Sequence, residues 1–110
     1  MSLPNSDNAV IDEAKVRDYL LSPEHPVGRF KAVFFNALGY SRDDWKVLGA
    51  HLLEFARSGT GIPQPAGTYG QKFELSGTIT GPAGRTASIT TVWIIRAAED
   101  FPRFVTAFPA

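Results

Sequence analysis

The sequence predicts an α+β domain, with three N-terminal helices packed on a twisted antiparallel sheet of three to four strands. Apolar residues recur at helical spacing as far as Phe55, and from Gln71 they alternate with polar residues as in strands. Between these patterns, residues 58–70 are rich in glycine and proline and are not expected to form a regular element. We therefore expect one domain of 110 residues: a helical half (8–57), a connecting loop and an antiparallel sheet (71–109).

The first two helices are expected over residues 12–21 and 26–38. Acidic residues open the first helix, where carboxylates complement the helix dipole, and Gly39 is a typical C-terminal glycine for the second. Apolar spacing predicts which side chains face the core. These are Val16, Tyr19 and Leu20 in the first helix, and Phe30, Val33, Phe34 and Ala37 in the second.

A third helix is expected to begin at Ser41, with Asp44 in a capping-box position. After the loop, strands are expected over residues 71–80, 86–96 and 103–108, and short turns make neighbouring strands antiparallel. Helix stripes and the apolar strand face must cover one another, so four side chains from both halves are expected to be buried together. They are Phe34, Trp45, Leu48 and Phe73.

The composition excludes several classes of function. The chain has no cysteine, which rules out disulfides, thiol catalysis and sulfur-based zinc sites, and its only histidines, His25 and His51, are far apart. We therefore expect neither a metal nor a cofactor. Eleven basic and eleven acidic residues balance, which argues against bulk electrostatic binding of nucleic acid. No apolar run is long enough to span a membrane and no secretory signal is visible, so a cytoplasmic location is expected.

The turn between the first two helices carries the most informative residues. Pro23 and Pro26 fix the backbone and leave His25 at the entrance of the second helix. Arg29 and Lys31 follow within two turns, and an imidazole with nearby cations at a helix N-terminus suits chemistry on a phosphate. The alternative is structural: His25 only caps the helix, and Lys31 is a solvated charge.

No Walker loop, HExxH or GxSxG motif is present, so the remaining candidates come from the second half of the chain. Tyr69 and Lys72 flank the entrance to the sheet, and Thr91 and Trp93 share one face of the long strand. Thr106 lies on the last strand. Tyr69 or Trp93 can stack a nucleobase. The alternative is again structural, because tryptophan and threonine are common strand residues.

Several segments along nearly the whole chain carry a family resemblance. They are KVRDYLL, HPVGRFKAVFF, LGY, a YG before the sheet, GPAGR, VW and the terminal FVTAFP. In this order they resemble a small, uncharacterised family of bacterial domains found at polymorphic-toxin C-termini and in toxin–antitoxin gene pairs. Such domains are similar to the metal-independent ribonucleases of the barnase/EndoU/colicin/RelE-like group.

The resemblance implies a metal-independent endoribonuclease-like toxin domain that acts on RNA and is inhibited by an antitoxin or immunity protein. His25, Lys31 and Thr106 would then be the catalytic residues. The substrate-binding residues would be Arg29, Tyr69, Lys72, Thr91 and Trp93. The alternative is a non-enzymatic interaction domain whose sheet binds a protein partner. An enzyme requires His25, Lys31 and a sheet residue to meet in one cleft bordered by the long strand.

Overall fold

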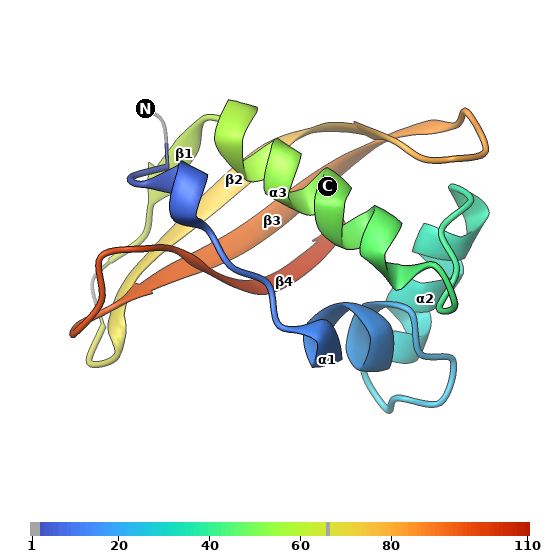
Figure 1. Cartoon of the computed structure of the whole chain (residues 1–110), viewed down its shortest axis with the longest axis horizontal. Coiled ribbons are helices and arrows are strands. Elements are labelled where there is room, and N and C mark those ends of the chain that lie inside the picture. The colour runs from blue at the N-terminus through green and yellow to red at the C-terminus, as the bar shows by residue number, and fades with distance from the viewer. Residues whose placement is uncertain (1–2, 66) are drawn as a thin grey trace.

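The computed structural model describes residues 3–65 and 67–110 and confirms the α+β class (Figure 1). The helices are not all N-terminal, because the last of them ends at Ser58, past the middle of the chain, and the strands follow it. No helix in the described part is long and apolar enough to cross a membrane. The helical elements are η1 (Ser6–Asn8), α1 (Glu13–Lys15), η2 (Val16–Leu20), α2 (Gly28–Ala37) and α3 (Trp45–Ser58). The strands are β1 (Gly61–Pro63), β2 (Gly70–Thr80), β3 (Thr86–Arg96) and β4 (Arg103–Pro109).

The first predicted helix is present but changes its winding midway. One α-helical turn, α1, passes into the π-helix η2, in which the Leu21 N–H donates to the Val16 carbonyl oxygen over 3.0 Å. Val16 and Leu20 are fully buried, as predicted, whereas Tyr19 is only half-buried. Single π turns occur often at functional sites, and here the wide turn is the segment that carries Asp18 and Tyr19.

The second helix begins at Gly28 rather than Pro26, and its predicted core face is largely wrong. Its buried side consists of Gly28, Ala32 and Phe35, whereas Phe30 and Val33 are exposed at 68% and 72%, and Ala37 is exposed as well. The physical reason is that α2 is apolar on two faces, so periodicity alone cannot tell which one meets the core.

The four strands form one antiparallel sheet in the order β1-β2-β3-β4. β2 and β3 pair along their whole length, from Gly70 opposite Arg96 to Thr80 opposite Thr86. The first strand corrects the expectation that residues 58–70 hold no regular element, because Gly61–Pro63 pairs with β2. β1 lies at the sheet edge and pairs on one side only, which is where a strand tolerates proline.

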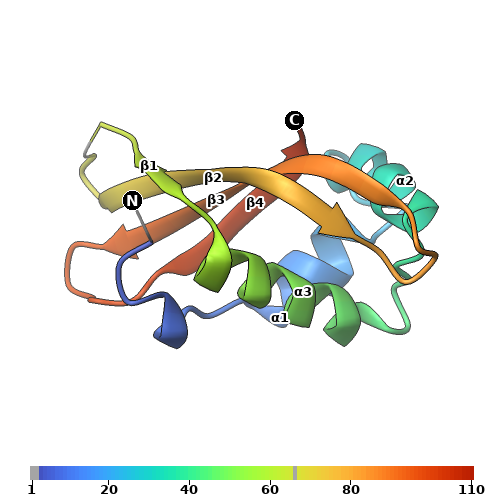
Figure 2. The same cartoon turned by 90° about the horizontal axis from the view of Figure 1, so that it is seen from above.

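The helices cover the sheet unevenly. Figure 2 shows α1 and α3 on one face, while α2 lies at the end of the sheet, beside the turn between β2 and β3. There the Ala83 N–H donates to the Leu38 carbonyl oxygen over 3.1 Å. The covered face holds the core, including fully buried Leu75, Ile89 and Trp93. Of the four side chains predicted to be buried together, Leu48 and Phe73 are buried, and Phe34 and Trp45 are partly buried against the core.

Replacing Gly28 by alanine should destabilise the protein and displace α2. An added Cβ would collide with the carbonyl group of Tyr19, which is backbone and cannot move aside cheaply. Gly49→Ala is the matched control, because nothing lies within 4 Å of its added Cβ and alanine is favoured over glycine in a helix by about 1 kcal/mol. Urea denaturation compares the two variants. A Gly28→Ala protein as stable as Gly49→Ala would contradict this account of the close approach.

Candidate functional site

His25 caps helix α2 through its ring. Its Nδ1 atom accepts hydrogen bonds from the backbone N–H groups of Val27 and Gly28, over 3.0 and 2.9 Å. These groups have no partner inside the helix, so the imidazole takes the place of a capping side-chain oxygen. Because Nδ1 is an acceptor, the ring proton resides on Nε2, which leaves one N–H donor for another group.

A polar cluster lies next to this cap and joins three elements of the fold. The Lys31 ammonium on α2 donates hydrogen bonds to Tyr19 Oη on η2 and to Thr106 Oγ1 on β4, each over 2.6 Å. The two oxygens are 3.3 Å apart and share a further hydrogen bond. The Lys31 nitrogen also lies 5.9 Å from the centroid of the Phe108 ring. Lys31 is therefore a positioned, half-buried cation rather than a solvated one.

The environment of Tyr19 favours its ionised form. Burial alone would raise the pKa of the phenol, but hydrogen bonds from Lys31 and Thr106 and the charges of Lys31 and Lys15 outweigh it. The net effect lowers the pKa of Tyr19 below its ordinary value. The buried Tyr40 behaves in the opposite way, since desolvation raises its pKa to about 12. The pKa values of the two tyrosines are thus shifted in opposite directions.

The cap and the cluster meet in one cleft. The rings of Tyr19 and His25 pack edge to face, with centroids 4.9 Å apart. Both residues line a cleft of about 780 Å³, together with Thr106. Lys31 is not one of the lining residues, and it is joined to the cleft wall by its hydrogen bonds to the Tyr19 and Thr106 oxygens. Of the two side chains predicted to converge, only His25 lines the cleft, which is bordered by β4 instead of the long strand β3.

A β-bulge shapes the strand side of this cleft. The pairing of β3 with β4 shifts between Val92 and Trp93, so that Val92 lies opposite Thr106 and Trp93 lies opposite Phe104. The extra residue is Val105, and both Val105 and Thr106 line the cleft. Bulges commonly redirect side chains next to active sites, and this one brings two consecutive residues to the same cavity.

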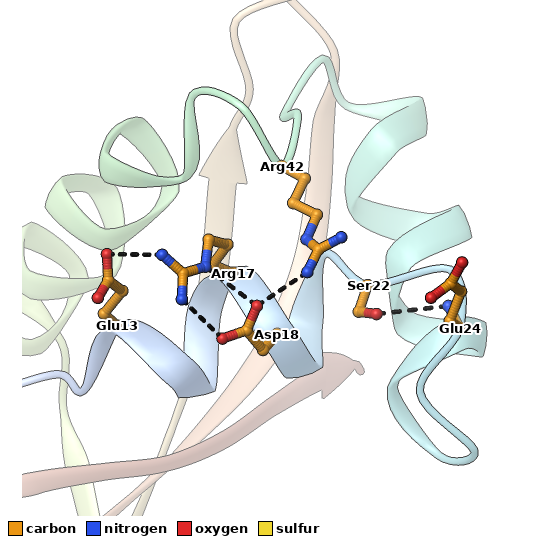
Figure 3. Close-up of polar contacts among 6 residues, drawn as sticks. All are labelled: Glu13, Arg17, Asp18, Ser22, Glu24 and Arg42. Atoms are coloured by element: carbon orange, nitrogen blue, oxygen red, sulfur yellow. Dashed lines mark hydrogen bonds and ion pairs between the residues drawn. The ribbon is translucent and has the colours of Figure 1, made fainter.

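An ion-pair network stabilises the acidic side of the cleft (Figure 3). The Asp18 carboxylate accepts hydrogen bonds from Arg17, at 2.9 and 3.0 Å, and from Arg42, at 3.0 Å. The bonds from Arg17 and Arg42 lower the pKa of Asp18 to about 2. Arg17 also pairs with Glu13 at 2.9 Å, and in the same view the Glu24 N–H donates to Ser22 Oγ over 3.3 Å. Two guanidinium groups thus offset a carboxylate that would otherwise repel an anion in the cleft.

Other candidate residues lie apart from this cluster. Arg29 is exposed, and its guanidinium carbon lies 4.8 Å from the centroid of the Phe30 ring. Tyr69 and Lys72 border a smaller hollow of about 190 Å³ at the β1–β2 connection. Figures 1 and 2 place this connection and α2 at opposite ends of the sheet. The structure therefore brings together His25, Lys31 and Thr106. Arg29, Tyr69 and Lys72 lie outside this group.

The structure places Thr91 and Trp93 in the core, which corrects their expected role in substrate binding. Both side chains are 0% exposed, and Trp93 Nε1–H donates to Thr91 Oγ1 over 2.9 Å. The Trp93 ring packs edge to face on Phe104, with centroids 5.3 Å apart. A ring enclosed on all sides cannot stack on a nucleobase, so the structural alternative applies to this pair.

Tyr19 is the principal site residue that the sequence analysis missed. Its position at helical spacing from Val16 assigned it to the core stripe. The signal available in the sequence was chemical, because a phenol at the edge of an apolar stripe needs a polar partner for its hydroxyl group. Asp18 and Lys15 were missed as well, and both line the cleft beside Tyr19.

A second polar pair joins the segment after α2 to helix α3. Tyr40 Oη and His51 Nδ1 are 2.6 Å apart, and His51 lines a hollow of about 220 Å³ next to α3 and β2. Among the residues that the structure describes, no three side chains of histidine, cysteine, aspartate or glutamate gather as metal ligands would.

Comparisons with known proteins address the family and the fold. A family model described as "Domain of unknown function (DUF6883)" matches residues 2–110. No curated protein matches the chain. The structure is similar to a chain of a contact-dependent growth inhibition toxin–immunity protein complex from Klebsiella pneumoniae 342. The TM-score is 0.72 and the sequence identity 23%, over 96% of each chain. This likeness shows a shared fold, and that fold occurs in a toxin system.

Replacing His25 by alanine should lower the free energy of unfolding by about 0.5–2 kcal/mol, as for other lost helix caps. The N–H groups of Val27 and Gly28 lose their acceptor in this variant. His25→Asn is the matched control, because the amide oxygen of asparagine is a good capping acceptor and should restore most of the stability. Urea denaturation of both variants provides the measurement. Equal destabilisation by alanine and asparagine would show that capping is not the contribution of His25.

Proposed function

The chain belongs to the DUF6883 family, and we propose that it is a bacterial toxin-system domain that cleaves RNA without a metal ion. One observation carries the proposal: the Lys31 ammonium is held 2.6 Å from both Tyr19 Oη and Thr106 Oγ1, and Tyr19 and Thr106 line an open cleft. The toxin assignment is supported by the fold shared with a chain of a toxin–immunity protein complex. RNA as substrate places the activity in the cytoplasm.

RNA can be cleaved by its own 2′-hydroxyl group, so the protein has to supply acid–base groups and stabilise negative charge. In the proposed reaction, the Tyr19 phenolate takes the proton of the 2′-hydroxyl, and the 2′-oxygen then attacks the phosphorus. The bond from phosphorus to the 5′-oxygen breaks, and Lys31 gives that oxygen a proton. The products are a 2′,3′-cyclic phosphate and a 5′-hydroxyl, and the short contact between Tyr19 and Lys31 returns the proton.

In this proposal His25 is not the general base. A general base needs a free ring nitrogen, but the free nitrogen here, Nε2, already carries the proton because Nδ1 accepts two backbone hydrogen bonds. We therefore assign His25 a hydrogen bond from Nε2–H to a phosphate oxygen, and Thr106 a positioning role beside Lys31. Arg29 is long and exposed, and in this proposal it swings toward the phosphate when RNA binds.

The sheet face opposite α3 offers a path for the rest of the RNA strand. Lys72 pairs with Ile94, and Thr106 pairs with Val92, so these four side chains share one face of the sheet. Exposed Tyr69 lies beyond Lys72, at the far end. We propose that Lys72 contacts a phosphate there and that Tyr69 stacks on a base, several nucleotides away from the cleft.

A non-enzymatic interaction domain is the second candidate function. It is favoured by the apolar side chains that α2 exposes to solvent, Phe30 and Val33. The two candidates differ in one respect that can be measured, since only the enzyme requires the ammonium of Lys31.

The purified protein should cleave total RNA in the presence of EDTA, and Lys31→Met should lower the rate by about 10²- to 10⁴-fold. Lys46→Met is the matched control, because Lys46 is an exposed lysine on α3, away from the cleft, and should retain wild-type activity. Circular dichroism establishes that both variants are folded. No cleavage by the wild-type protein, or equal loss in both variants, would leave the interaction domain as the function.

A further inference from the structure

Helix α2 carries an apolar surface that this chain leaves uncovered. We call it the outer stripe: Val27, Phe30, Val33, Phe34 and Ala37. Val27, Phe30 and Val33 are 57%, 68% and 72% exposed, Ala37 is exposed as well, and Phe34 is partly buried. The members are spaced by three or four residues, so they lie along one side of the helix.

Apart from Phe34, which packs partly against the core, the outer stripe is distinct from the side of α2 that faces the core. At about 100° per residue, its members fall within an arc of roughly 120°, and Gly28, Ala32 and Phe35 occupy a different arc. A surface helix of a monomer is normally polar on the side away from its core. Large contiguous apolar patches on a protein surface mark interaction sites. α2 is therefore built to be covered on both sides.

We propose that the outer stripe is the docking surface for an acidic protein partner. The charges along it have one sign: α2 carries Arg29 and Lys31, and no acidic residue occurs between Gly28 and Ala37. The Arg29 guanidinium lies over the Phe30 ring, and Arg85 donates to the Ala37 carbonyl oxygen over 3.4 Å at the other end of the helix. A complementary surface is apolar at its centre and carries carboxylates at both ends.

The same charges argue against a second copy of this chain as the occupant. If two outer stripes packed in antiparallel fashion, Arg29 of one molecule would approach Arg85 of the other, which is a like-charge contact. A membrane surface is a poorer match as well. The exposed stripe covers only about three helical turns, and one of the two cations of α2, Lys31, is turned toward Thr106.

The outer stripe continues into the cleft. Val27 belongs to both, since it begins the stripe and lines the cleft beside His25. A partner that covers the stripe therefore reaches the mouth of the cleft and can close it. This inhibitory consequence rests on the proposed function, whereas the docking itself does not.

The test uses the full chain and the purified product of the open reading frame next to its gene, with titration calorimetry as the readout. The wild-type protein should bind, and Phe30→Glu and Val33→Glu should each weaken binding by at least about 100-fold, since each buries an unpaired carboxylate. Ile62→Glu is the matched control: Ile62 is 60% exposed on β1, outside α2, and should bind like the wild type. Arg29→Glu should weaken binding most at low salt.

Several outcomes would overturn the proposal. The proposal is wrong if the wild-type protein does not bind the partner, or if Val33→Glu binds it as tightly as the wild type does. It is also wrong if binding is lost in Ile62→Glu and not in the α2 variants. Self-association lost in Val33→Glu would assign the stripe to a second copy. Cosedimentation with phosphatidylserine vesicles, lost in the same variant, would assign it to a membrane.

Failure of docking and failure of the proposed function are distinguishable. Lys31→Met leaves the outer stripe intact and should bind the partner like the wild type, even though it cleaves no RNA. Phe30→Glu should cleave RNA like the wild type but resist inhibition by the partner. Binding without any RNA cleavage would retain the docking surface and reject the nuclease.

Discussion

The half-buried ammonium group of Lys31 joins three elements of this fold, α2, η2 and β4. Lys31 is held by two hydroxyl oxygens, those of Tyr19 and Thr106, and its nitrogen lies 5.9 Å from the centroid of the Phe108 ring. A cation away from water is costly unless such partners surround it. The partners come from η2 and β4, so these elements must lie together around α2. Gly28 allows the same approach, because a side chain there would strike the backbone of Tyr19.

The sequence predicts the class of the fold and the pairing of its strands, but it does not predict which surfaces are covered. Alternation places Thr91 and Trp93 on one face of β3, yet Val92 and Ile94 make the opposite face apolar as well, so alternation alone does not identify the core side. The same ambiguity misassigned the faces of α2. His25 and Lys31 were found because prolines and charges interrupt an apolar run. Tyr19 was missed because its spacing matches the core and its hydroxyl partner lies 87 residues away.

The candidate site and the outer stripe are both parts of α2, and this shared origin explains why one short helix carries so many constraints. His25 caps the N-terminus of α2, the outward side of the helix is apolar, and Lys31 points into the cluster with Thr106. The chain belongs to the DUF6883 family and shares its fold with a chain of a toxin–immunity protein complex. A partner that docks on the outer stripe would contact the same helix that carries Lys31, the lysine of the proposed reaction.

The central claim is that the Lys31 ammonium acts on the Tyr19 hydroxyl, and a pH titration of the tyrosine Cζ resonances by carbon-13 NMR tests it most directly. The account predicts that Tyr19 titrates below the ordinary tyrosine range and before Tyr40, whose pKa burial raises to about 12. In Lys31→Met the pKa of Tyr19 should rise, because the phenolate loses its hydrogen-bond donor and the nearby positive charge. A pKa of Tyr19 that is not lowered, or that is the same in both proteins, would contradict the account.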